Sequence, residues 1–113
     1  MLFLVELDHV KSGTMLMPEA GREFISRIIL PTLAISEELL ADKKILAGGP
    51  VVGRVSLRFI LQVDSLQDVD KVLTNLPIWP HADTRATPLV SFGDRRAQVE
   101  ALQNVLSAMR SQE

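Results

Sequence analysis

Residues 51–63 read Val-Val-Gly-Arg-Val-Ser-Leu-Arg-Phe-Ile-Leu-Gln-Val, and their alternation is the clearest structural signal in the chain. Over 55–63 nearly every second residue is apolar, while Arg54, Ser56 and Arg58 fall on the opposite side. A period of two is that of a β-strand, whose successive side chains point to opposite faces. The segment predicts a strand over 51–63 with one face against a core and one polar face.

The segments on either side predict an alternating order of strands and helices. Pro31 falls inside the first helical segment and is expected to kink or split it, because proline removes a backbone hydrogen bond. Ser65 is a good N-cap for the second helical segment. Strands are expected at 2–7, 45–47 and 82–90, and helices at 18–42, from 65 to about 74, and from 93 onward.

This order predicts an α+β fold: a ferredoxin-like β-α-β-β-α-β domain with an antiparallel sheet. The domain is expected to span residues 1–92, with a C-terminal helical extension at 93–113. Two helices cover only one face of a four-stranded sheet, so the other face needs a cover. A second chain is the usual solution and predicts a homodimer or larger ring, although the third helix is an alternative cover.

Composition excludes several classes of function. The formal net charge is −2 and no Lys/Arg run occurs, which argues against nucleic acid as a partner. There is no cysteine and there are two histidines, so thiolate and three-histidine metal sites within one chain are excluded. No apolar run approaches the roughly 18 residues of a membrane span. We therefore expect a cytoplasmic protein that has no membrane partner.

Several segments resemble the muconolactone Δ-isomerases. They are the start Met1-Leu2-Phe3-x-Val5, Val52-Gly53-Arg54, the strand ending at Val63, and Leu76-Pro77-Ile78-Trp79-Pro80 continuing through Asp83 to Thr87-Pro88-Leu89. Lys44 to Pro50 is also similar to the YciI-related branch of the same superfamily. The resemblance covers about residues 1 to 90. It implies a dimeric α+β barrel that assembles into larger rings and isomerises a small lactone without metal or organic cofactor.

The polar side of the 51–63 strand is the main candidate for binding a ligand. Arg54, Ser56 and Arg58 are placed together there. A buried unpaired guanidinium is costly, and a guanidinium binds a carboxylate through two hydrogen bonds, which suits a small organic acid or lactone acid. The alternative is an ion pair across subunits with Glu6 or Asp83. Trp79 is a further candidate contact, or else an apolar plug at an interface.

Three residues are candidates for moving a proton, as an isomerase requires. Glu6 interrupts an otherwise apolar strand, and the alternative is an exposed position near a strand end. Asp83 matches the family's aspartate, and otherwise fixes the loop after Pro80. His81 follows Trp79-Pro80 in a loop and is a proton shuttle or a surface histidine.

Two functions remain open from the sequence. The first is a muconolactone-isomerase-like enzyme of aromatic-compound breakdown that binds a small carboxylated lactone. The second is a non-catalytic oligomeric module with a structural or small-ligand-binding role. They differ in whether the arginines pair with protein carboxylates or converge on an open cavity.

Overall fold

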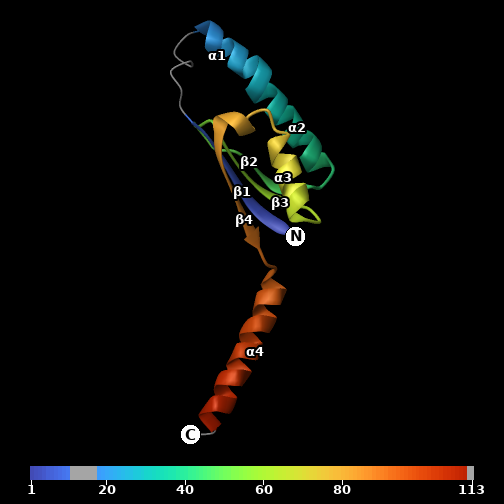
Figure 1. The fold of residues 1–113 in the computed structure, drawn as a ribbon, viewed down its shortest axis with the longest axis vertical. Coiled ribbons are helices and arrows are strands. Elements are labelled where there is room, and N and C mark those ends of the chain that lie inside the picture. Colours follow the sequence, from blue (N-terminus) through green and yellow to red (C-terminus); the bar gives the residue numbers. More distant parts are fainter. Residues whose placement is uncertain (11–17, 112–113) are drawn as a thin grey trace.

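The computed structural model describes residues 1–10 and 18–111, and a four-stranded antiparallel sheet is its central element (Figure 1). The strands run in the order β2-β3-β1-β4. Their bounds are β1 Leu2–His9, β2 Ile45–Pro50, β3 Ser56–Gln62 and β4 Ala82–Leu89. The order of strands and helices along the chain confirms the predicted α+β ferredoxin-like fold.

The first helical region is continuous although Pro31 lies within it. It comprises α1 Pro18–Phe24, the π-helical turn η2 Ile25–Ile29 and α2 Leu30–Ala41. The backbone N–H of Leu30 donates to the carbonyl of Ile25, five residues back, as in a π-turn. In place of the expected kink or split, the helix has a widened turn just before Pro31. The helix therefore continues although proline has no N–H to donate.

The helices α2 and α3 (Leu66–Thr74) lie on the same side of the sheet (Figure 1). Ser65 caps α3 as predicted, since its side chain accepts from the Asp68 N–H at 3.1 Å. The side chains between helices and sheet form one apolar core. Its members include Phe3, Val5 and Leu7 of β1, Leu57, Phe59 and Leu61 of β3, Val69 and Leu73 of α3, and Leu76 and Ile78 of the following loop.

The opposite face of the sheet is left without a covering helix in the described chain. Leu4, Glu6 and Asp8 of β1 alternate with the core residues and are half-buried. The register places Leu4 beside Ile60 and Glu6 beside Arg58. We call this surface the open sheet face.

Two strand boundaries differ from the sequence-based expectation. β2 continues through the Gly48-Gly49-Pro50 segment, and β3 begins only at Ser56, so Arg54 lies in the turn between them. Gly48 has a φ of +130°, and a Cβ there would collide with the backbone carbonyl oxygen of Arg58. Glycine thus allows β2 to pair where another residue would force the strands apart.

The C-terminal helix α4, Phe92–Ser111, extends away from the sheet along the longest dimension of the molecule (Figure 1). Ser91 caps it by accepting the Asp94 N–H at 3.0 Å. Every residue from 92 to 110 is exposed. Among the described residues, no helix is both long and apolar enough to cross a membrane.

Candidate functional site

One end of the sheet brings together three chain segments that are distant in sequence. The His9 N–H, at the end of β1, donates to the Val55 carbonyl at 3.0 Å. The Val10 N–H donates to the His81 carbonyl, also at 3.0 Å. Residues preceding β3 and β4 are therefore fixed beside the end of β1 by backbone hydrogen bonds, so their side chains share one end of the sheet.

Both described histidines contact the ring of Phe24, the last residue of α1. The ring centroids of His9 and Phe24 are 4.9 Å apart, and those of Phe24 and His81 are 5.5 Å apart in an edge-on arrangement. Edge-to-face and tilted ring pairs are favourable geometries. His9 is half-buried and His81 is exposed. We call these three residues the sheet-end cluster.

A cavity of about 130 Å³ lies between α2 and the segment that enters β3. Its walls are mainly apolar, and Arg54 is the charged residue that lines it. A larger hollow of about 300 Å³ adjoins it along α2 and adds Ser36 and Glu37. The two share the walls Leu33, Pro50 and Leu57. An apolar pocket with few polar groups is typical of small-molecule sites.

The cavity wall is hydrogen-bonded to the sheet-end cluster. Ile78 lines the cavity and its carbonyl accepts the His81 N–H at 2.8 Å, while Val55 lines it and accepts from His9. Thr32, only 2% exposed, fixes this wall. Its hydroxyl donates to the Ile28 carbonyl at 2.6 Å and accepts the Ile78 N–H at 3.1 Å.

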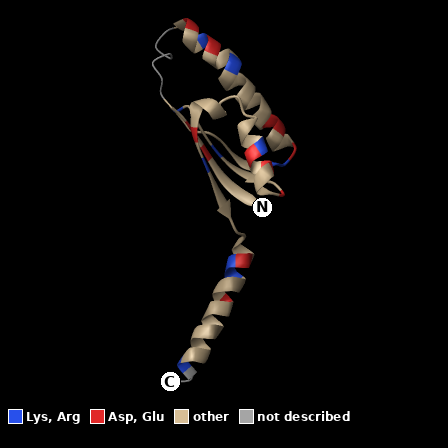
Figure 2. Ribbon diagram, in the orientation of Figure 1, with Lys and Arg blue, Asp and Glu red and all other residues tan. Residues whose placement is uncertain are grey.

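Arg58 lies on the open sheet face and is paired with protein carboxylates. Its Nη1 is 3.0 Å from Asp8 Oδ1, its Nη2 donates to Asp8 Oδ2 at 3.3 Å, and its Nε is 3.5 Å from Glu6 Oε2. Figure 2 shows acidic and basic residues along the strands of the sheet. The two arginines therefore have different surroundings: Arg58 is paired with carboxylates of its own chain, while Arg54 lines a cavity.

Asp8 is the carboxyl group most changed by this arrangement. A hydrogen bond from Ser56 and another from Arg58 lower its pKa below the ordinary 3.8, with further attraction from Arg58 and Arg54. Both donors stabilise the charged form. Asp8 is therefore held in its charged form as the counter-ion of Arg58.

The predicted site residues do not all lie in one place. Arg54, Ser56 and His81 gather at the end of the sheet, although Ser56 is 6% exposed and bonded to Asp8. Glu6 is paired on the open sheet face. The remaining two, Asp83 and Trp79, are exposed, and Asp83 faces Asp8 in the register of β1 and β4.

Sequence reasoning missed two members of this end of the sheet. Phe24 has the spacing of an apolar core stripe along its helix, so nothing in the sequence marks it as a contact of the histidines. His9, like His81, can be interpreted from the sequence as a surface histidine or a proton shuttle, and nothing in the sequence places the two side by side. Across the described residues, no group of three His, Cys, Asp or Glu is arranged to hold a metal ion.

Comparison with known proteins agrees with this architecture. Muconolactone isomerase superposes with a TM-score of 0.65 at 16% sequence identity, over 80% of this chain and 90% of that chain. The chain has the fold of muconolactone isomerase. This fold also matches the 5-chloro-2-hydroxyhydroquinone dehydrochlorinase TftG of Burkholderia phenoliruptrix AC1100, solved with 2,5-dihydroxybenzoquinone. That match has a TM-score of 0.58 and 19% identity, over 83% of this chain and 98% of that chain. No protein-family model and no curated protein sequence matches the chain.

Proposed function

We propose that this protein binds a small carboxylated lactone or related cyclic acid at the end of its sheet and moves a proton on it, as a homo-oligomer in the cytoplasm. The observation that carries the proposal is the placement of Arg54 on an apolar cavity, two of whose wall residues accept backbone hydrogen bonds from the N–H groups of His9 and His81. An anchor for an acid and two proton-transfer groups thus share one end of the sheet.

Arg54 is suited to hold the carboxylate of the ligand. It is exposed, and its guanidinium carries five N–H donors that match a carboxylate in pairs. The apolar walls provided by Leu33, Leu57 and Ile78 suit the ring of the substrate. A cavity of about 130 Å³ that adjoins the hollow of about 300 Å³ fits a compact cyclic acid and not a nucleotide.

His81 is proposed as the group that accepts the proton from carbon. Migration of a double bond in a lactone and loss of HCl, the reactions suggested by the names of the two structural neighbours, both require removal of a proton from carbon. An imidazole accepts and returns a proton near neutral pH. His9, which also contacts the ring of Phe24, is a second acceptor, while the exposed Asp83 and the paired Glu6 are weaker candidates by placement.

The non-catalytic alternative rests on a different observation. Arg58 is bound by Asp8 and Glu6 on the open sheet face, so its charge is neutralised by the chain itself. An assembly module needs such a neutralised, self-complementary surface and needs no free arginine on a cavity. The two functions are therefore distinguished by whether the protein binds a small acid through Arg54.

Thermal-shift titration tests the role of Arg54. Muconolactone, related lactones and small dicarboxylic acids are added to the native protein, and a ligand that binds only the folded state raises Tm with concentration. Arg54→Gln is expected to abolish the shift, while Arg85→Gln, an exposed arginine of β4, retains it. A native protein that no acid stabilises while its assembly is intact would favour the non-catalytic module.

Deuterium exchange tests the proton transfer directly. A bound lactone in D₂O is expected to exchange its acidic C–H in the presence of the native protein, as read by NMR of the ligand. His81→Gln is expected to slow this exchange by about 100-fold, the lower end of general base contributions. If Asp83→Asn or Glu6→Gln removes exchange and His81→Gln leaves it, the base is a carboxylate instead.

A further inference from the structure

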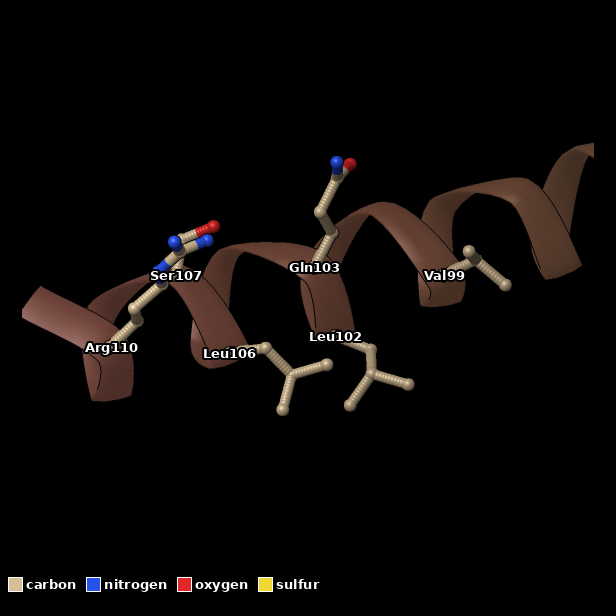
Figure 3. Close-up of a pocket in the computed structure, with 6 residues that line it drawn as sticks. All are labelled: Val99, Leu102, Gln103, Leu106, Ser107 and Arg110. Carbon is tan, nitrogen blue, oxygen red and sulfur yellow. The ribbon is translucent and has the colours of Figure 1, made fainter.

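The helix α4 carries an apolar stripe that no part of the described chain covers. Its residues Val99, Leu102, Leu106 and Met109 have exposed fractions between 53% and 61%. Figure 3 shows Leu102 and Leu106 pointing to the same side of the helix and Gln103 pointing to the other. A large contiguous apolar surface on a projecting helix is typical of an interaction site.

The spacing of the stripe is that of a helix-pairing seam. The four residues 99, 102, 106 and 109 follow intervals of three, four and three. This is the repeat that keeps apolar positions facing a second helix through a shared heptad. Because the repeat is the same in every copy of the chain, the stripe is complementary to itself.

Charge also favours pairing of like with like. The segment 101–109 has no charged residue, so two stripes meet without burying a charge. Arg96 and Glu100 are paired within the same helix, with Nε and Oε1 3.0 Å apart. In Figure 2 most of the charge on α4 lies near its two ends.

The size of α4 indicates that this contact works together with another. A 20-residue helix is about 30 Å long and about 10 Å wide, so one face offers on the order of 300 Å². A stable interface buries about 800 Å² on each partner. In the described part of the chain, the open sheet face is also uncovered. We therefore expect the α4 contact to add its area to an interface made by that face.

We propose that α4 is an assembly arm that pairs with the α4 helix of a second copy of this chain through Val99, Leu102, Leu106 and Met109. The partner is a helix with the same stripe, which supplies apolar surface of equal length and no charge. The proposal is independent of any ligand bound at the end of the sheet.

Single-cysteine cross-linking tests the contact, because the chain contains no cysteine of its own. Leu102→Cys and Leu106→Cys are oxidised mildly in the full-length protein and analysed on a non-reducing gel. Either variant alone is expected to form a dimer if the helices run parallel. A co-expressed mixture of the two is expected to form one if they run antiparallel.

Asn104→Cys is the matched control, since position 104 is two residues from both leucines and lies on the opposite side of the helix. Equal cross-linking of Asn104→Cys, or none by the leucine variants alone or mixed, overturns the proposal. A disulfide formed by Leu102→Cys with Ile60→Cys in one chain or between chains overturns it too, because α4 then covers the open sheet face.

Native mass measurement provides a second test that needs no cysteine. Leu102→Glu with Leu106→Glu is expected to move dissociation of the assembly to about tenfold higher protein concentration. Asn104→Glu adds a charge to the far side and is expected to leave it unchanged. Circular dichroism and Tm confirm that the domain stays folded. An unchanged midpoint in the double variant contradicts pairing through this stripe.

Discussion

Arg54 and Arg58 are four residues apart and are chemically identical, yet their surroundings differ. Arg58 is part of β3, where the register sets it beside Glu6, and Asp8 lies close enough for two contacts. Arg54 stands one residue before the end of the turn, and it lines the cavity under α2. The role of each arginine is therefore set by where β3 begins.

Acid titration of the folded protein is expected to show the contribution of the Asp8 carboxylate to stability. The folded pKa of Asp8 is lowered from 3.8, so its contribution to stability is present above that value and is lost as pH falls through the lower folded pKa. In Asp8→Asn, the decrease of Tm between about pH 5 and about pH 2 is expected to be smaller than in the native protein.

The control for this titration is Asp83→Asn, which removes the facing carboxylate of β4 without removing a contact of Arg58. It should keep the native dependence on pH, and Arg58→Gln should weaken it. A native slope in Asp8→Asn would show that other carboxyl groups govern acid unfolding.

At the scale of elements, the junction between α2 and the loop before β4 depends on one buried hydroxyl. Thr32 follows the π-turn of η2 and Pro31, and its side chain joins the Ile28 carbonyl to the Ile78 N–H. The junction closes the cavity wall that carries the His81 backbone. The widened π-turn before Pro31 thus lies directly before the part of α2 that lines the cavity.

Thr32→Val is expected to lower the free energy of unfolding by about 1–3 kcal/mol, because it leaves a buried backbone N–H without its acceptor. Urea unfolding measures this change. Thr74→Val is the matched control: that hydroxyl also bonds the carbonyl four residues back, but it is exposed. Its expected cost is within about 0.5 kcal/mol. Equal costs for the two variants would mean that the contact to Ile78 is not stabilising.

At the scale of the whole molecule, the described residues leave the open sheet face and α4 uncovered. Leu4 and Ile60 are apolar and lie beside each other on the open sheet face, next to the pair of Glu6 and Arg58. A sheet with helices on one side only leaves its other face exposed, so a second copy packed against that face is the natural cover. Self-association through this face is part of the proposed function.

Ile60→Lys is expected to reduce the native mass of the assembly, because each copy would bring an unpaired charge to the contact. Light scattering after size exclusion measures the mass. Gln67→Lys adds the same charge on exposed α3, on the side away from this face, and should leave the mass unchanged. An unaltered mass for Ile60→Lys would exclude the open sheet face as the contact.

The order of strands and helices, the cap at Ser65 and the apolar spacing along α4 can be read from the sequence alone. These features follow from periods of two and about 3.6 residues and from local hydrogen bonds, which neighbouring residues set. The fold class is therefore readable without coordinates.

Which polar residues come into contact depends on the tertiary structure. The contact of His9 and His81 through Phe24, the pairing of Arg58 with Asp8, and the cavity at Arg54 each join segments distant along the chain. They depend on strand register and on the placement of Phe24, the last residue of α1, at the end of the sheet. A shift of one residue in register would reverse every side chain, and no local pattern fixes that choice for polar residues at strand ends.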